Sequence, residues 1–203
     1  MVKAKNTKTI NNNKLYTGVG DQGTTTLFHC DQGRISKSAN IIEALGTLDE
    51  LNAYIGIVKV YSEIEGLKVL LGKKNISYSD ILNDIQQTLF IIQAEVAGSD
   101  MTVSKADLKK IETIVEAISI LLPPIRSFTV SGGSLLSAEL DFSRTLARKA
   151  ERQIIGVLEE GMRNLGKETI AYMNRLSTIL FALSRYTNHL LAIREEHPKY
   201  NKK

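Results

Sequence analysis

A loop rich in glycine and threonine near the start of the chain could bind an anion. Between Tyr16 and Thr26 the sequence holds three glycines, four threonines and one acid, Asp21. Glycine lets the backbone turn its N–H groups toward an anion, and hydroxyl groups add donors. Lys37, further along, could supply a point charge to a phosphate. The loop is not a Walker A motif, because no Gly-Lys-Ser/Thr follows. A plain glycine-rich hairpin turn explains it equally well.

A second group of charged residues recurs at helical spacing between residues 141 and 152. Steps of three and four place them on one helix face. They are Asp141, Arg144, Arg148, Glu151 and Arg152. One interpretation is a solvated face with local ion pairs, each worth only a few tenths of a kcal/mol. The three arginines favour another, because guanidinium groups make bidentate contacts with phosphate or with a carboxylate of another subunit.

Two further stretches could contribute to a site. A mixed polar and aromatic strip with helical spacing comprises Asn174, Ser177, Thr178, Phe181 and Arg185. Such a strip is also typical of packing at the rim of a core. The second stretch is the segment 123–133, in which Gly132 and Gly133 precede Ser134. This arrangement would place backbone N–H groups at a helix N-terminus, where an anion or a loop can dock. Phe128, taken alone, is predicted to be a core residue.

The residues that usually perform protein-based catalysis do not form a group. The three histidines lack metal-ligand spacing. The adjacent His29–Cys30 pair could act as base and nucleophile only in a geometry that sequence neighbours seldom provide. No pair of catalytic carboxylates stands out, and no side chain is predicted to bind a metal. An enzyme of this kind would use a reactive substrate or cofactor and supply mainly binding and orientation.

Five amphipathic helices are predicted to position these stretches. Apolar residues recur at three- and four-residue steps over about 40–66, 79–97, 104–122, 133–160 and 167–195. Ser79 is the predicted N-cap of the second helix, and Ser104 with Asp107 resembles a capping box for the third. Strand signals are sparse, although residues 14–17 and 24–28 could pair around the glycine turn. We therefore predict an all-α five-helix bundle with an irregular Gly/Thr-rich N-terminal loop.

Composition and charge exclude several classes of protein. The 203 residues carry a net charge of +4, but the excess lies in basic tails, predicted at 1–13 and 196–203. The single domain between them, 14–195, has no basic excess, which argues against a nucleic-acid partner. One cysteine excludes a disulfide framework. No apolar run reaches the ~20 residues of a membrane span, and the polar start lacks a signal-peptide core. We expect a soluble cytoplasmic protein without a membrane partner.

Taken together and in order, the motifs resemble the PduO-type ATP:cob(I)alamin adenosyltransferases. The resemblance spans roughly residues 14–190. It is carried by Tyr16–Thr24, Ser36-Lys37, Gly46–Asn52, Phe128–Gly133, Arg144–Arg152 and Met173–Ser177. Gly18 and Val19 stand where the family usually has a basic residue and a threonine, and Ser131 replaces the family's proline. Each motif is modest alone, but the combination is highly specific.

The resemblance implies a homotrimer that holds ATP between subunits. The cobalt of cob(I)alamin would attack the 5′ carbon of ATP, forming adenosylcobalamin and releasing triphosphate. Because cobalt is the nucleophile, no protein nucleophile is required. Mg²⁺ would arrive with ATP, held mostly by phosphate oxygens. A reductase and an adenosylcobalamin-dependent enzyme are the implied protein partners. The alternatives are a cobalamin carrier on the same scaffold without turnover, and a helical interaction module with basic tails.

The same resemblance implies roles for individual residues. The N-terminal residues that would hold ATP are Thr17, Gly18, Val19, Gly20, Thr25, Thr26 and Lys37. The facing subunit would bind ATP through Arg148, Glu151, Arg152 and Asn174, with Arg148 stabilising the triphosphate. Asp49 and Arg144 would form an ion pair between subunits. Phe128 would occupy the lower face of cobalt, where an apolar ring excludes the lower ligand and makes reduction to Co(I) easier.

Overall fold

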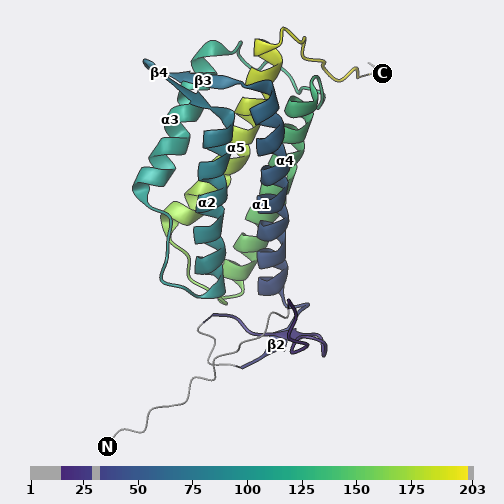
Figure 1. Ribbon diagram of the computed structural model, residues 1–203, viewed down its shortest axis with the longest axis vertical. Helices are drawn as coiled ribbons and strands as arrows, with labels where there is room; N and C mark the ends of the chain where they lie inside the picture. The colour runs from purple at the N-terminus through teal and green to yellow at the C-terminus, as the bar shows by residue number, and fades with distance from the viewer. Residues whose placement is uncertain (1–14, 29–32, 201–203) are drawn as a thin grey trace, which may run out of the picture.

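Five helices form an elongated bundle in the computed structural model (Figure 1). The structure describes residues 15–28 and 33–200. The helices are α1 (Asn40–Glu65), α2 (Tyr78–Ala97), α3 (Lys105–Leu121), α4 (Leu135–Glu159) and α5 (Lys167–Leu190). The predicted five-helix bundle is therefore confirmed. The predicted 1–13 tail and the His29–Cys30 pair lie outside the described residues.

Helix boundaries follow local capping chemistry. Ser104 and Asp107 form the predicted capping box at the start of α3. The prediction that Ser79 caps α2 is wrong, because the Ser77 hydroxyl accepts the Asp80 N–H at 3.0 Å instead. At the other end of the chain, α5 ends at Leu190 rather than near residue 195. The segment beyond it is thus available to contact other parts of the molecule.

Helix α4, which carries the predicted charged face, packs between two other helices. It packs against α1 on one side and α5 on the other, while α2 packs on α1 and α3 on α5. Ala147 and Ala150 are fully buried, and their small side chains allow neighbouring helices to approach closely. Buried leucine and isoleucine side chains elsewhere in the core each contribute about 1.5–3 kcal/mol. This core holds the outward charged face of α4 in a fixed orientation.

The short strands differ from the predicted pairing. Strand β1 (Thr24–Thr25) pairs antiparallel with β2 (Ile35–Ser36), so the predicted pairing of 14–17 with 24–28 is wrong. Two successive tight turns redirect the chain between those segments. In them, Asp21 N–H donates to the Gly18 carbonyl and Gly23 N–H donates to the Gly20 carbonyl. The Arg34 side chain then bonds to Thr24 Oγ1 at 2.8 Å and holds the downstream segment beside β1.

A second hairpin between α1 and α2 was not predicted. Strand β3 (Lys68–Leu71) pairs with β4 (Lys74–Ser77) through a two-residue turn. Gly72 occupies that turn with φ +61°, a conformation that favours glycine at the first position of a two-residue hairpin turn. The hairpin lies beside α3, away from the charged face of α4.

The Gly/Thr-rich loop and the loop between α3 and α4 were both predicted to contribute to a binding site. They lie at opposite ends of the bundle (Figure 1). The Gly/Thr-rich loop precedes α1 and lies near the end of α4, where Asn40 donates a hydrogen bond to Glu160. The loop that carries Phe128 precedes the start of α4. Because α4 has 25 residues, about 37 Å of helix separates the two ends. Among the described helices, none is long and apolar enough to cross a membrane.

Candidate active site

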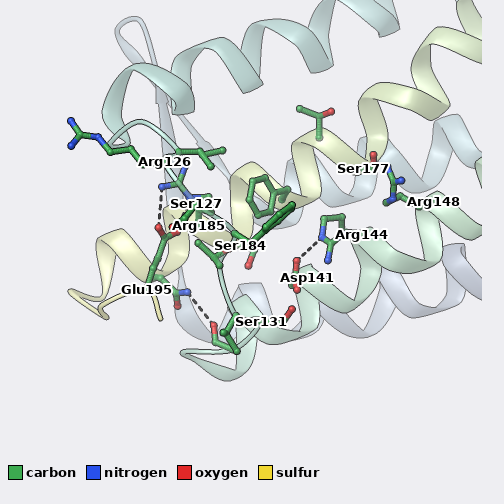
Figure 2. Close-up of a pocket in the computed structure, with 18 residues that line it drawn as sticks. Arg126, Ser127, Ser131, Asp141, Arg144, Arg148, Ser177, Ser184, Arg185 and Glu195 are labelled. Atoms are coloured by element: carbon green, nitrogen blue, oxygen red, sulfur yellow. Dashed lines mark hydrogen bonds and ion pairs between the residues drawn. The ribbon is translucent and has the colours of Figure 1, made fainter. Parts of the chain in front are cut away.

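A cavity of about 650 Å³ lies beside α4 and α5, under the loop that joins α3 to α4 (Figure 2). Its wall includes three of the predicted catalytic residues, Phe128, Arg144 and Arg148. Most of the predicted α5 strip lines it as well, namely Ser177, Thr178, Phe181 and Arg185. The structure thus brings together residues from three separate sequence motifs.

Phe128 lies on the wall of this cavity with 78% of its surface exposed. The prediction from the residue alone, that Phe128 packs in the core, is wrong. Its side chain cannot reach the interior because the segment 123–133 passes over the ends of α4 and α5. An exposed aromatic ring at a cavity wall is available to pack on a flat apolar ligand surface.

Arg144 is held in place by a buried carboxylate on its own helix. Its Nε donates to Asp141 Oδ1 at 2.6 Å, as Figure 2 shows. Burial raises the pKa of Asp141, but hydrogen bonds from Arg144 and Ser131 outweigh it, so the net pKa lies below its ordinary value. Asp141 is therefore ionised at neutral pH. Asp49 lies exposed on α1, and the described residues of one chain do not pair it with Arg144.

Arg148 presents its charged group to solvent at the cavity. The side chain is exposed, and its guanidinium has no ion-pair partner among the described residues. The backbone carbonyl of Arg148 accepts a hydrogen bond from Arg152 Nη1 at 3.1 Å, which folds the Arg152 side chain back along α4. Two guanidinium groups thus lie on successive turns of one helix face, an arrangement suited to a polyanion.

A hydrogen-bonded chain of side chains continues this face from α4 to α5 and α3. Asn174 Nδ2 donates to Glu151 Oε1 at 2.9 Å, and Asn174 Oδ1 accepts from Arg175 Nη1 at 2.8 Å. Arg175 Nε in turn bonds to Glu112 Oε1 at 3.3 Å. The chain fixes which way the Asn174 amide points. It also joins Glu151 to Asn174. These are the two residues of this face that were predicted to bind ATP without carrying a positive charge.

The predicted phosphate-binding residues of the N-terminal loop also lie close to one another, but they do not line the cavity beside α4 and α5. Lys37 N–H donates to the Gly23 carbonyl at 2.9 Å, and a Cβ added to Gly20 would lie 3.1 Å from Lys37 Nζ. The glycine therefore leaves room for the lysine beside the loop. Thr17, Gly18 and Val19 are exposed on the same loop, as is Thr26, whereas Thr25 is half-buried in β1.

Arg34 is an organising residue of this loop that sequence reasoning missed. Its Nη2 donates to the carbonyls of Val19 at 2.8 Å and Thr24 at 2.6 Å. These contacts join the two sides of the loop and fix its outline. The sequence offers little signal for this role, because the partners lie 10 and 15 residues away without a periodic pattern.

The Cobalamin adenosyltransferase family matches residues 15–187 of the chain. This chain belongs to that family. The corrinoid adenosyltransferase PduO of Citrobacter freundii is 34% identical over an alignment of 183 residues that covers 86% of this chain and 50% of the relative. The chain thus spans about half the length of that relative. The corrinoid adenosyltransferase of Mycobacterium bovis is 31% identical over 86% of this chain and 89% of its own.

Solved structures agree with this assignment. A variant of the PduO-type ATP:corrinoid adenosyltransferase of Lactobacillus reuteri, complexed with cobalamin and ATP, covers 93% of this chain and 98% of its own, with a TM-score of 0.78 and 26% identity. A second variant of the same enzyme, complexed with ATP, has a TM-score of 0.76 and 25% identity. The resemblance drawn from the motifs is confirmed, and the family is one of transferases.

Proposed function

We propose that this protein transfers the 5′-deoxyadenosyl group of ATP to the cobalt of cob(I)alamin. A bond forms between cobalt and the 5′ carbon, the bond from that carbon to the triphosphate oxygen breaks, and triphosphate leaves. The observation that carries the proposal is the cavity in which Phe128 and Arg148 meet. Cobalamin and ATP in a solved relative of the same fold give it further support.

Arg148 stabilises the leaving group in this proposal. Negative charge builds on the triphosphate as the carbon–oxygen bond breaks, and a guanidinium already in place meets it without reorganisation. Glu151, Arg152 and Asn174 extend the contact along the same face of α4 and α5. Phe128 covers the lower face of cobalt, excludes a lower ligand and makes reduction to Co(I) easier.

The active site is shared between chains of a homotrimer. In one protomer, the Gly/Thr-rich loop and the loop that joins α3 to α4 lie at opposite ends of α4 (Figure 1). Because about 37 Å of helix separates this loop from the Phe128 end of α4, the loop that holds the phosphates comes from a neighbouring protomer in this proposal. Asp49 of one chain then pairs with Arg144 of the next. Arg144 is suited to this role, because Asp141 fixes its orientation and leaves 27% of its side chain exposed.

Magnesium enters with ATP and is held mostly by phosphate oxygens. We place the enzyme in the cytoplasm as a single domain over 14–195 with two basic tails. A reductase would supply the electron for Co(I), and an adenosylcobalamin-dependent enzyme would receive the product.

A spectral assay tests the function directly. Cob(I)alamin is generated chemically and mixed with the protein, with and without ATP. The proposal predicts that the Co(I) spectrum converts to that of adenosylcobalamin only when ATP is present, with triphosphate released in equal amount. A carrier would bind the corrinoid without conversion, and that result would overturn the proposal.

A further inference from the structure

The end of the described chain folds back over the loop that carries Phe128. We call residues 123–133 the Phe128 loop and residues 193–197 the C-terminal strap. The strap begins directly after α5, where Ile193 N–H donates to the Asn188 carbonyl at 2.8 Å. It then runs beside the Phe128 loop and lines several hollows together with it. Two segments about 70 residues apart thus lie side by side.

A charged pair fixes the start of this contact. Arg185 on α5 binds Glu195 in a bidentate manner, with Nε to Oε1 at 2.6 Å and Nη2 to Oε2 at 3.0 Å. Arg185 Nη2 also donates to the Pro123 carbonyl at 3.2 Å. The Arg185 side chain is only 8% exposed. One buried guanidinium therefore joins the strap to the first residue of the Phe128 loop, as Figure 2 shows for its bond to Glu195.

The next two strap residues bind the loop on both sides of the phenylalanine. Val130 N–H donates to the Glu196 carbonyl at 2.8 Å. His197 Nδ1 lies 2.9 Å from the Phe128 carbonyl oxygen and 3.0 Å from Ser127 Oγ. A proton on Nδ1 would be donated to the carbonyl, which has no proton of its own to give. The residue that carries the ring is thus held through its own backbone.

The far end of the loop is held by α4 and α5, without the strap. Ser137 Oγ on α4 donates to the Gly132 carbonyl at 2.9 Å. Asn188 Nδ2 donates to the Gly132 carbonyl at 3.1 Å. Gly133 has φ +107°, and a Cβ there would overlap the Asn188 side chain. Helices α4 and α5 therefore fix the loop where it enters α4, while the strap fixes it near Phe128. Because the Phe128 ring is mostly exposed and gains little packing of its own, its position depends on these backbone contacts.

We propose that the C-terminal strap positions Phe128 against the corrin, with Glu195 and His197 as positioning residues for the reduction of Co(II) to Co(I). This inference rests on the role of Phe128 given above. An apolar ring can exclude a lower ligand only if it stays within contact distance of cobalt. Without the strap, the middle of the Phe128 loop would lose its bonds at Val130 and Phe128 and sample other positions.

The test compares His197→Ala with Lys199→Ala in the full chain. Lys199 lies two residues further along, is exposed and makes no hydrogen bond or ion pair with the loop among the described residues. With ATP and cob(II)alamin bound, electron paramagnetic resonance measures the fraction of cobalt without a lower ligand. We expect His197→Ala to lower that fraction about three- to tenfold, as the loss of one hydrogen bond allows, and Lys199→Ala to leave it unchanged. Adenosylation of chemically prepared cob(I)alamin should change little in either variant.

A double variant, Glu195→Ala with His197→Ala, should lower the fraction further. Hydrogen exchange of the peptide covering 125–131 supplies a readout that needs no turnover, and it should rise in the order Lys199→Ala, His197→Ala, double variant. Unchanged exchange and an unchanged four-coordinate fraction in the double variant would overturn the inference. If instead the unmodified chain fails to adenosylate cob(I)alamin, the proposed function fails, and hydrogen exchange still decides whether the strap holds the loop.

Discussion

The Phe128 loop and the N-terminal Gly/Thr-rich loop are both irregular, but they are built differently. The Phe128 loop receives bonds from Arg185, Asn188 and His197, side chains that all belong to the same chain. It therefore reaches its working shape within one protomer. The N-terminal loop is shaped mainly by Arg34 and its own turns, and most of its threonine and glycine residues face solvent. Its surface is suited to a partner that one protomer does not supply.

This difference indicates how the work is divided between the two substrates. In the proposed function, the corrinoid side of the site consists of Phe128 and its supports, which all lie in one chain. The proposed ATP side consists of the charged face of α4 and a loop at the far end of the molecule. We infer that changes on the corrinoid side will act within each protomer, whereas changes on the ATP side will act across the interface.

The largest effect is expected at Arg148, where the two sides meet. Arg148→Ala should lower turnover by about 10²- to 10³-fold, because a preorganised donor to the leaving group is lost. Lys149→Ala is the matched control on the same helix, since it removes only an exposed ion pair with Glu50 worth ~1 kcal/mol or less. Steady-state kinetics with cob(I)alamin and ATP measure both. Equal turnover in the Arg148 variant and the parent would remove Arg148 from its role.

Phe128→Ala should separate reduction from adenosyl transfer. With cob(II)alamin and a reductant, most of the yield of Co(I) should disappear, because a lower ligand can bind cobalt again. With cob(I)alamin prepared beforehand, the rate should stay close to that of the parent, since the transfer step uses Arg148 instead. A variant that reduces cob(II)alamin normally would show that the ring does not cover the lower face.

Lys37→Ala should weaken ATP binding without affecting the corrinoid. Loss of one charged contact to phosphate is expected to raise the KM for ATP about 10- to 100-fold, while the KM for cob(I)alamin stays the same. Gly20→Ala should have a smaller effect in the same direction, because its methyl group would press on Lys37 Nζ. A parallel change in both KM values would contradict the division between the two sides.

Asp141→Asn should have a smaller effect on activity than the variants above and act mainly on stability. The pKa of Asp141 lies below its ordinary value of 3.8, so its stabilising contribution is present above about pH 4 and is lost as the pH falls further. At pH 7 the variant should lose about 1–3 kcal/mol of unfolding free energy, and the difference should shrink below pH 4. Denaturant titrations at several pH values measure this.

Asp84→Asn provides the comparison for Asp141. Its ion pair with Lys110 is about half exposed on both sides, so the loss should stay below ~1 kcal/mol at every pH. If the two variants lose the same stability and show the same pH dependence, Asp141 is not a special anchor for Arg144.

Local pattern predicted the helices and the charged face well. The buried positions of α4, such as Ala147 and Ala150, follow the predicted period, and its arginines lie on the outer face. The hairpin of β3 and β4 was not predicted. The sequence contains its Gly72-Lys73 turn, but each of the two strands has only four residues. Short strands lack the length over which alternation can be distinguished from a helical pattern.

Contacts between segments that are distant in the chain could not be predicted from the sequence. Phe128 looks like a core residue because nothing in its neighbours shows that the loop passes outside the bundle. The bond between His197 and that loop joins residues 69 and 70 positions apart, and the Asp141–Ser131 contact depends on how the loop enters α4. Motif resemblance predicted which residues share a function, whereas the structure shows which of them one protomer brings together.

Mixing two variants that are impaired in different halves of the proposed site tests the shared site most directly. Lys37→Ala and Arg148→Ala chains, coexpressed in equal amounts, would form trimers in which some sites combine an intact loop from one chain with an intact Arg148 from the next. The account predicts recovery of about one quarter of parental activity at limiting ATP, because each site draws its two halves independently. Activity no higher than that of the separate variants would contradict it and place the whole site within one chain.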